Sequence, residues 1–240
     1  LRCAWAGSQR YGALVWSGDI DCTFETFRRQ MAAGLNMGIA GIPWWTTDIG
    51  GFSGGDPDDP AYRELLVRWF QWGAFCPVFR LHGFRMDKSR PFTPTHPDGS
   101  SSDEVFSGGP NEVWSYGEEV YGILVKYLKM RERLKPYVTQ LMKAAHEKGT
   151  PVMRPLFYDF PSDPLAWDQR EEYMFGPDLL VAPILYPGMR KRSVYLPAGA
   201  TWRNAETGSE HKGGQTVDAD APLELIPLFV RDSTELPLRG

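Results

Sequence analysis

The chain has 240 residues, of which 42% are hydrophobic and 23% charged, and its formal net charge is −4. This length can bury the core of one large or two modest domains, and the nearly balanced charge argues against nucleic acid or a membrane surface as a partner. The chain has no apolar run of about 18 residues that would cross a bilayer. The three cysteines are widely spaced and the four histidines scattered, so we expect no disulfide framework, no metal site and no cofactor.

The first part of the chain alternates short apolar runs with helical patterns. Strands are predicted at residues 2–5 and 11–16, followed by a helix over residues 24–35 with Asp21 as its N-cap. The next apolar run, residues 38–45, is predicted to be a strand that ends in an acidic, glycine-rich loop.

The same alternation continues toward the middle of the chain. Asp59 and Pro60 are typical of a helix start, since Asp is a preferred N-cap and Pro fits the first helical position. A strand is predicted at residues 76–81, and residues 86–111 form a polar segment predicted to be a long loop.

A helical pattern then covers residues 112–147, and Pro136 is expected to kink or divide it. Residues 150–158 form the last strand of this series. Alternating strands and helices are typical of a parallel sheet or a (β/α) barrel.

The pattern changes after about residue 172. Short apolar runs at residues 179–185, 193–196 and 223–230 are separated by Pro-Gly, Ala-Gly and Gly-Gly turns. This is typical of a small antiparallel β domain. We therefore divide the chain into an α/β part, residues 1–170, and a β part, residues 171–240.

Acidic residues directly follow two of the predicted strands. Asp19 comes after Trp16, Ser17 and Gly18, and Asp48 comes before Gly50. An α/β protein presents catalytic groups at the carboxyl ends of its strands. The residues alone leave open whether Asp19 only caps a loop, or whether Asp19 and Asp48 form a pair of catalytic acids.

The nine tryptophans are many for this length, and several flank Gly, Asp or His. Aromatic rings beside carboxylates suit sugar binding, because apolar sugar faces stack on rings while hydroxyl groups bond to acids. Most of these rings are expected to belong to the core.

Four stretches together resemble glycoside hydrolase family 31, the retaining α-glucosidases and α-xylosidases. They run in order through most of the chain. The stretches are GSQRY (7–11) with WSGD (16–19), WTTDIGGF (45–52), RWFQWGAFCP (68–77) with RLHG (80–83), and PVMRPLF (151–157) with FGPDLLVAP (175–183).

This resemblance implies a (β/α)8 catalytic barrel followed by a β-sandwich. It assigns Asp19 the role of general acid/base and makes Asp48 an acid of the pocket and not the nucleophile. The substrate-binding residues that it implies are Arg2, Trp16, Asp48, Phe52 and His82. Trp45 and Arg85 remain open between a structural role and a place in the site.

The nucleophile of this family is an Asp on an earlier barrel strand, in an Asp-x-x-Glu context that we do not find here. An eight-stranded barrel typically takes about 250 residues. We therefore expect the chain to be a fragment that begins after the nucleophile, comprising the second half of a (β/α)8 barrel and most of a β-sandwich. On its own it should have no hydrolase activity.

The resemblance implies hydrolysis of terminal α-linked xylose or glucose from an oligosaccharide by double displacement. A transglycosylase, an α-glucan lyase and a non-catalytic sugar-binding remnant are the alternatives. The sequence does not choose between xylose and glucose, and it leaves open the compartment and the formation of a homo-oligomer.

Overall fold

A computed structural model describes residues 1–85 and 108–239, so most of the loop predicted at residues 86–111 lies outside the described residues. Its helices are α1 (Phe24–Ile39), α2 (Pro60–Gly73), α3 (Glu118–Arg133), α4 (Lys135–Lys148) and α5 (Leu156–Asp159), with short 3-10 helices η1 (Ser8–Tyr11) and η2 (Pro164–Trp167). Its strands are β1 (Val15–Trp16), β2 (Trp45–Thr46), β3 (Met153–Arg154), β4 (Tyr173–Phe175), β5 (Leu179–Val181), β6 (Lys191–Leu196), β7 (Thr201–Asn204), β8 (Glu210–Lys212), β9 (Gln215–Asp220) and β10 (Leu228–Arg231).

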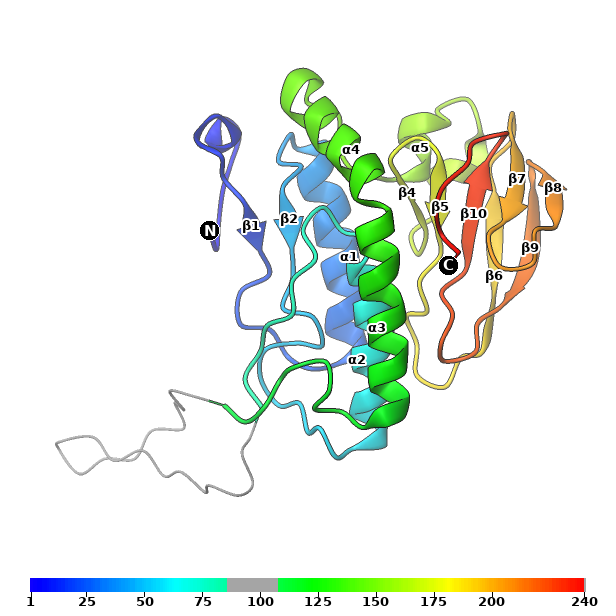
Figure 1. The fold of residues 1–240 in the computed structure, drawn as a ribbon. Coiled ribbons are helices and arrows are strands. Elements are labelled where there is room, and N and C mark those ends of the chain that lie inside the picture. The colour runs from blue at the N-terminus through cyan, green and yellow to red at the C-terminus, as the bar shows by residue number, and fades with distance from the viewer. Residues whose placement is uncertain (86–107, 240) are drawn as a thin grey trace, which may run out of the picture.

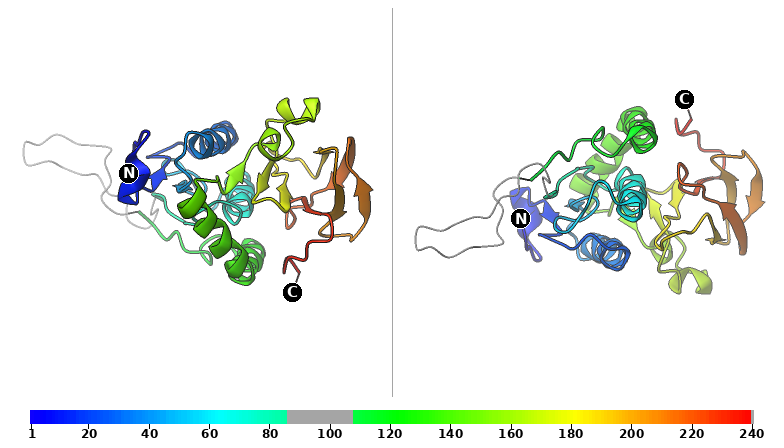
Figure 2. Two further views of the ribbon diagram at one scale, coloured as in Figure 1. Left: turned by 90° about the horizontal axis from the view of Figure 1, so that it is seen from above. Right: turned by 90° about the horizontal axis from the view of Figure 1, so that it is seen from below.

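The molecule has three parts, which Figure 1 shows side by side. The β1–β2 pair lies at one side, helices α1 to α4 lie in the middle, and the strands of the C-terminal part lie at the other side. The views from above and below in Figure 2 show the same order. Among the described helices, none combines the length and the apolar character needed to span a membrane.

Strands β1 and β2 pair in parallel, with Val15 opposite Trp45 and Trp16 opposite Thr46. Helix α1 connects them, so this is the strand–helix–strand unit that the alternating pattern predicts. Each strand is only two residues long, and both predicted strands, 11–16 and 38–45, are therefore too long.

Helix α1 extends beyond its predicted end because its glycines serve close packing. A Cβ at Gly34 would lie 2.8 Å from the ring of Trp45, and a Cβ at Gly38 would lie 3.1 Å from the carbonyl oxygen of Met153. The low helix propensity of glycine is thus outweighed here by packing, because only a residue without a side chain lets Trp45 and Met153 approach the helix so closely. The helix also begins differently, because Thr23, and not Asp21, accepts a hydrogen bond from the Thr26 N–H as N-cap.

Two predicted strands are absent from the described structure. Residues 2–5 form no ladder, and Trp5 is 72% exposed. Hydrogen-bonded turns at the end of α2 lead into residues 76–81, which form no strand. The Val78 N–H donates to the Trp45 carbonyl at 3.2 Å, but no ladder forms. An apolar run predicts burial, whereas a strand also needs a partner along its length.

The predicted helix at residues 112–147 is divided into α3 and α4, as expected from Pro136, which lies in the first turn of α4. The predicted strand at 150–158 is shorter than expected and belongs elsewhere. Only β3 is extended, and it pairs antiparallel with β4. The chain turns at Pro155 into α5, so β3 continues the C-terminal sheet.

The C-terminal part is antiparallel, as predicted. Six strands pair in the order β3-β4-β5-β10-β7-β8, and β6 pairs with β9 in a second sheet. Along β5, Leu179 and Val181 belong to the core shared with the helices, while Leu180 belongs to the core shared with β6 and β9. Around β4 and β5 the sheet is thus covered on both faces, which explains why these two strands are apolar and buried at every position.

Candidate active site

The carboxyl ends of β1 and β2 lie together, because parallel strands end at the same edge of a sheet. A side chain fastens the two ends to each other. The Asp48 N–H donates to Ser17 Oγ at 3.1 Å, and Ser17 Oγ donates to the Gly18 carbonyl at 3.0 Å. The segments that carry Asp19 and Asp48 therefore meet at one edge.

Asp19 lies in an exposed group with two other predicted site residues. Arg2 Nη2 donates to Asp19 Oδ2 at 2.8 Å, and the guanidinium carbon of Arg2 lies 5.4 Å from the centre of the Trp16 ring. The side chains of Arg2 and Asp19 are 66% and 43% exposed. Since exposed ion pairs contribute little to stability, this ion pair contributes little to holding the fold together.

Asp48 lies in a different environment, with a side chain that is fully buried. Its Oδ1 accepts a hydrogen bond from Arg80 Nη1 at 2.6 Å. Burial raises the pKa of the Asp48 carboxyl, while the hydrogen bond and charge of Arg80, and then the charge of His82, oppose that rise. The charge of Asp19 raises this pKa further. Asp48 Oδ2 has no hydrogen-bond partner among the described residues.

Phe52 and His82 form the other side of the group, with ring centroids 5.7 Å apart. The Phe52 N–H donates to the Ile20 carbonyl at 2.7 Å, and the Phe84 N–H donates to the Phe52 carbonyl at 2.8 Å. The loop that carries Phe52 is thus hydrogen-bonded both to the Asp19 segment and to the His82 segment. The fold therefore brings the segments of all six predicted residues to one edge.

Arg80 and Ser17 are the residues of this group to which the sequence assigned no role. Arg80 provides the cation that a buried carboxylate requires, and Ser17 joins the two strand ends. The sequence holds one signal for Arg80, its place at the end of the predicted strand 76–81 and two residues before His82, since alternate side chains of a strand lie on the same side.

Trp45 and Arg85, which the sequence left open, are both buried. Trp45 packs against Gly34 and is 5% exposed, and Arg85 is 0% exposed. Every nitrogen of the Arg85 guanidinium donates to a protein acceptor. Among the described residues Trp45 Nε1 has no hydrogen-bond partner, as is also the case for Asp48 Oδ2. In residues 1–85 and 108–239 there is also no group of three or more His, Cys, Asp and Glu side chains that could hold a metal ion.

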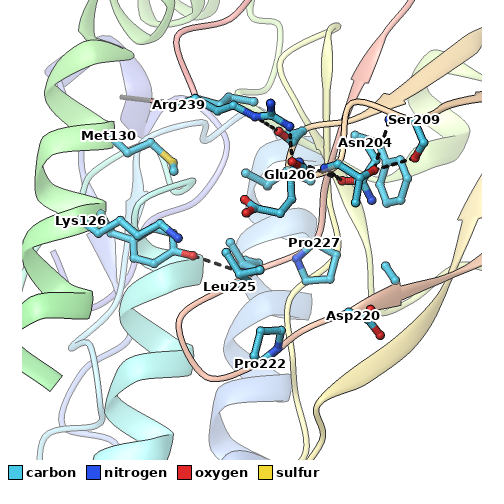
Figure 3. A pocket seen from close by; sticks show the side chains of 18 of the residues that line it. Lys126, Met130, Asn204, Glu206, Ser209, Asp220, Pro222, Leu225, Pro227 and Arg239 are labelled. Carbon is cyan, nitrogen blue, oxygen red and sulfur yellow. Dashed lines mark hydrogen bonds between the residues drawn. The ribbon is translucent and has the colours of Figure 1, made fainter. Parts of the chain in front are cut away.

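A cavity of about 740 Å³ lies away from this group, between α3 and the C-terminal strands. Figure 3 shows Lys126 and Met130 on one side of it and Asn204, Glu206 and Ser209 on the other. None of the six predicted site residues lines it. The Asp19 group instead lies at the edge of a two-stranded sheet, where only part of a barrel mouth is formed.

Comparison with known proteins gives matches over nearly the whole chain. Residues 1–141 match the glycosyl hydrolases family 31 TIM-barrel domain, and residues 149–234 match the glycosyl hydrolase family 31 C-terminal domain. The α-xylosidase of Saccharolobus solfataricus is 41% identical over 239 residues, which cover 100% of this chain and 30% of that protein.

Solved structures agree with this match. The crystal structure of a family 31 α-xylosidase from a soil metagenome, in complex with xylose, superposes with a TM-score of 0.90 at 61% identity, covering 98% of this chain and 34% of that one. A xylosidase from Aspergillus niger superposes with a TM-score of 0.83 at 36% identity, covering 97% and 33% of the respective chains. The chain thus spans about a third of the length of these relatives. With part of a TIM-barrel domain followed by an antiparallel C-terminal domain, it belongs to glycoside hydrolase family 31.

Proposed function

We propose that this chain supplies the general acid/base of a retaining α-glycosidase that releases terminal α-linked xylose from oligosaccharides. The observation that carries this proposal is the position of Asp19, 43% exposed at the carboxyl end of β1 and next to Arg2 and Trp16, two residues proposed to bind the sugar. Xylose is preferred over glucose because relatives named α-xylosidases match nearly the full chain at 61% and 41% identity, while relatives named α-glucosidases that cover nearly the full chain match at 33% and 35%.

A retaining glycosidase uses two carboxyl groups about 5–5.5 Å apart, one as nucleophile and one as acid and then base. In our proposal Asp19 protonates the leaving oxygen while a nucleophilic Asp from the preceding part of the barrel attacks the anomeric carbon. Asp19 then takes a proton from the water that hydrolyses the glycosyl-enzyme.

The neighbouring residues bind the sugar in this proposal. Arg2 donates to a hydroxyl group beside the cleaved bond, and Trp16 and Phe52 provide apolar walls. His82 and Asp48 bond to further hydroxyl groups. Asp48 is suited to this because one of its carboxylate oxygens has no hydrogen-bond partner in the described part of the chain.

The test uses the chain together with its own coding sequence upstream of Leu1. Aryl α-xylosides are expected to be hydrolysed faster than aryl α-glucosides, with α-xylose as the first product detected by NMR. Release of β-xylose would exclude retention, and faster hydrolysis of glucosides would exclude the sugar assignment. An unsaturated anhydro-sugar or a transfer product would identify a lyase or a transglycosylase instead.

The role of Asp19 is tested by the acidity of the leaving group. Asp19→Ala is expected to slow the first step by about 10²–10⁴-fold for poor leaving groups, and far less for dinitrophenolate, which needs no proton. The matched variant Asp48→Ala should affect both leaving groups alike. If the leaving-group dependence appears in Asp48→Ala and is absent in Asp19→Ala, the assignment is wrong.

A further inference from the structure

We propose that Arg85 is a positioning residue that sets Phe52 and His82 at their working separation, and that it does so from beneath the site without touching substrate. This inference rests on the proposed function, since it takes Phe52 and His82 to be walls of the sugar site. It begins from Arg85 being completely buried at the end of the segment that carries His82.

Arg85 joins two segments through backbone carbonyl groups. Its Nη2 donates to the Gly51 carbonyl at 3.2 Å, and its Nη1 donates to the Phe52 carbonyl at 3.2 Å and to the Phe84 carbonyl at 2.8 Å. One guanidinium group thus bonds to the loop that carries Phe52 and to Phe84, in the segment that carries His82. The fixed fork of donors turns these contacts into a fixed spacing.

The backbone around Arg85 is shaped to admit the guanidinium. Gly50 and Gly51 both have positive φ, 83° and 81°, a conformation that L side chains rarely adopt. A Cβ at Gly83 would lie 2.7 Å from Arg85 Nη1 and 2.7 Å from the Gly51 carbonyl oxygen. The two segments therefore approach too closely for a side chain, and Arg85 fills the space beside them.

A second set of contacts holds the guanidinium itself. Arg85 Nε donates to Tyr116 Oη at 3.1 Å, and the Tyr116 hydroxyl donates to Asn111 Oδ1. Asn111 Nδ2 donates in turn to the Gly83 carbonyl at 3.2 Å, and the Tyr62 ring centre lies 5.0 Å from the guanidinium carbon. The hydrogen bonds return to the segment of His82, so Arg85 has little freedom to move alone.

The consequence for catalysis follows from the Phe52–His82 contact. These rings lie 5.7 Å apart on the two segments that Arg85 joins. A lysine at position 85 would keep the charge, but a single ammonium cannot reproduce the spread of the fork. Displacements of about 1 Å at residues that position substrate can cost about 10²-fold in rate.

Arg68 in α2 provides a matched control. It is also completely buried, and it donates to carbonyl groups of the C-terminal part, including those of Met189 at 3.1 Å, Ala221 at 2.7 Å and Leu225 at 2.8 Å. Arg68→Lys therefore removes the same kind of interaction at a place remote from Phe52 and His82. A loss of stability alone would be shared by the two variants.

The experiment compares Arg85→Lys and Arg68→Lys in the protein extended upstream of Leu1. We expect Arg85→Lys to lower kcat/KM for an aryl α-xyloside by about 10–100-fold, and Arg68→Lys to change it by less than about 3-fold, at similar losses of Tm. Equal effects of the two variants on kcat/KM would overturn the proposal. Tyr116→Phe, which removes one acceptor of Arg85, is the milder variant if Arg85→Lys does not fold. Its expected loss in kcat/KM is about 5-fold, which corresponds to about one hydrogen bond, and a loss no larger than that of Arg68→Lys would overturn the proposal.

Amide hydrogen exchange decides the positioning role without any activity. The Phe52 N–H donates to the Ile20 carbonyl and the Phe84 N–H to the Phe52 carbonyl. Both amides should exchange faster in Arg85→Lys than in the wild-type protein, and at the wild-type rate in Arg68→Lys. If the wild-type protein hydrolyses no glycoside but exchange changes at these amides, the proposed function fails and the positioning role stands. If exchange at these amides is unchanged in Arg85→Lys, the positioning role fails.

Discussion

The α/β part and the β part each contain a buried carboxylate, and the two differ in how many of their oxygens accept hydrogen bonds. In the β part, Glu172 accepts from the Tyr195 N–H at 3.0 Å through one oxygen and from Arg192 at 3.2 Å through the other. In the α/β part, Asp48 accepts from Arg80 through one oxygen, and within the described residues its other oxygen has no partner. Buried polar groups of a stable core are normally satisfied, so the unpartnered oxygen of Asp48 supports the proposed bond to a substrate hydroxyl group.

The comparison extends to the surroundings of the two carboxylates. Glu172 lies next to strands that form two sheets around a common core. Its bonds to Arg192 and to the Tyr195 N–H therefore help to hold β6 against this core. Asp48 lies at the end of a two-residue strand, beside exposed Asp19 and His82. In our proposal, Glu172 thus contributes to stability and Asp48 to substrate binding.

The largest expected effect is a loss of stability on removing Glu172. Glu172→Ala leaves Arg192, whose side chain is 10% exposed, without its carboxylate. An unpaired buried charge costs about 3–5 kcal/mol. We expect a loss of this size in the free energy of unfolding at pH 8, measured by denaturant titration of the upstream-extended protein, with kcat/KM retained. A stable variant would show that the pair is not structural.

A somewhat smaller effect is expected from pH. Burial raises the pKa of Glu172 to about 7 from 4.5, so the folded state binds a proton that the unfolded state releases. Its stabilising contribution is complete below pH 4.5 and is lost as the pH rises through 7, by up to about 3 kcal/mol. Glu172→Gln should lack this component. Between pH 5 and 8 the free energy of unfolding should therefore fall more in the wild-type protein than in the variant. Parallel curves would contradict the assignment.

The smallest effect on folding is expected at Asp48, with a clear effect on catalysis. Arg80, the partner that remains in Asp48→Ala, is 33% exposed and can be hydrated. We expect kcat/KM to fall by about 10²-fold, because a hydrogen bond between a charged group and substrate is lost. The free energy of unfolding should fall less than in Glu172→Ala. The reverse ranking of the two variants would remove the distinction between the two carboxylates.

The sequence predicts the meeting of Asp19 and Asp48 because both follow strands, and parallel strands end at one edge. It does not predict Arg85 as a structural residue, because its acceptors at Gly51, Phe52 and Tyr116 come from segments about 30 residues away in either direction. Burial and partners of a charged side chain are tertiary properties that local pattern does not contain.

Element boundaries fail for a related reason. The helix was predicted to end at residue 35, whereas the close contacts of Gly34 with Trp45 and of Gly38 with Met153 place both glycines inside α1. The strand at β3 was assigned to the preceding series because its antiparallel partner β4 comes later in the chain. The domain boundary at residue 170 stays a prediction.

The position of β10 has a consequence for how the β part forms during synthesis. In the order β3-β4-β5-β10-β7-β8, the last of these six strands to be made lies in the middle and is the strand that joins β5 to β7. Until Leu228–Arg231 leave the ribosome, β5 and β7 each lack a neighbour, and the apolar residues of β5 remain uncovered on that edge. A premature stop a few codons before Leu228 should therefore yield a polypeptide that depends on chaperones or is degraded, although the Asp19 group would be complete.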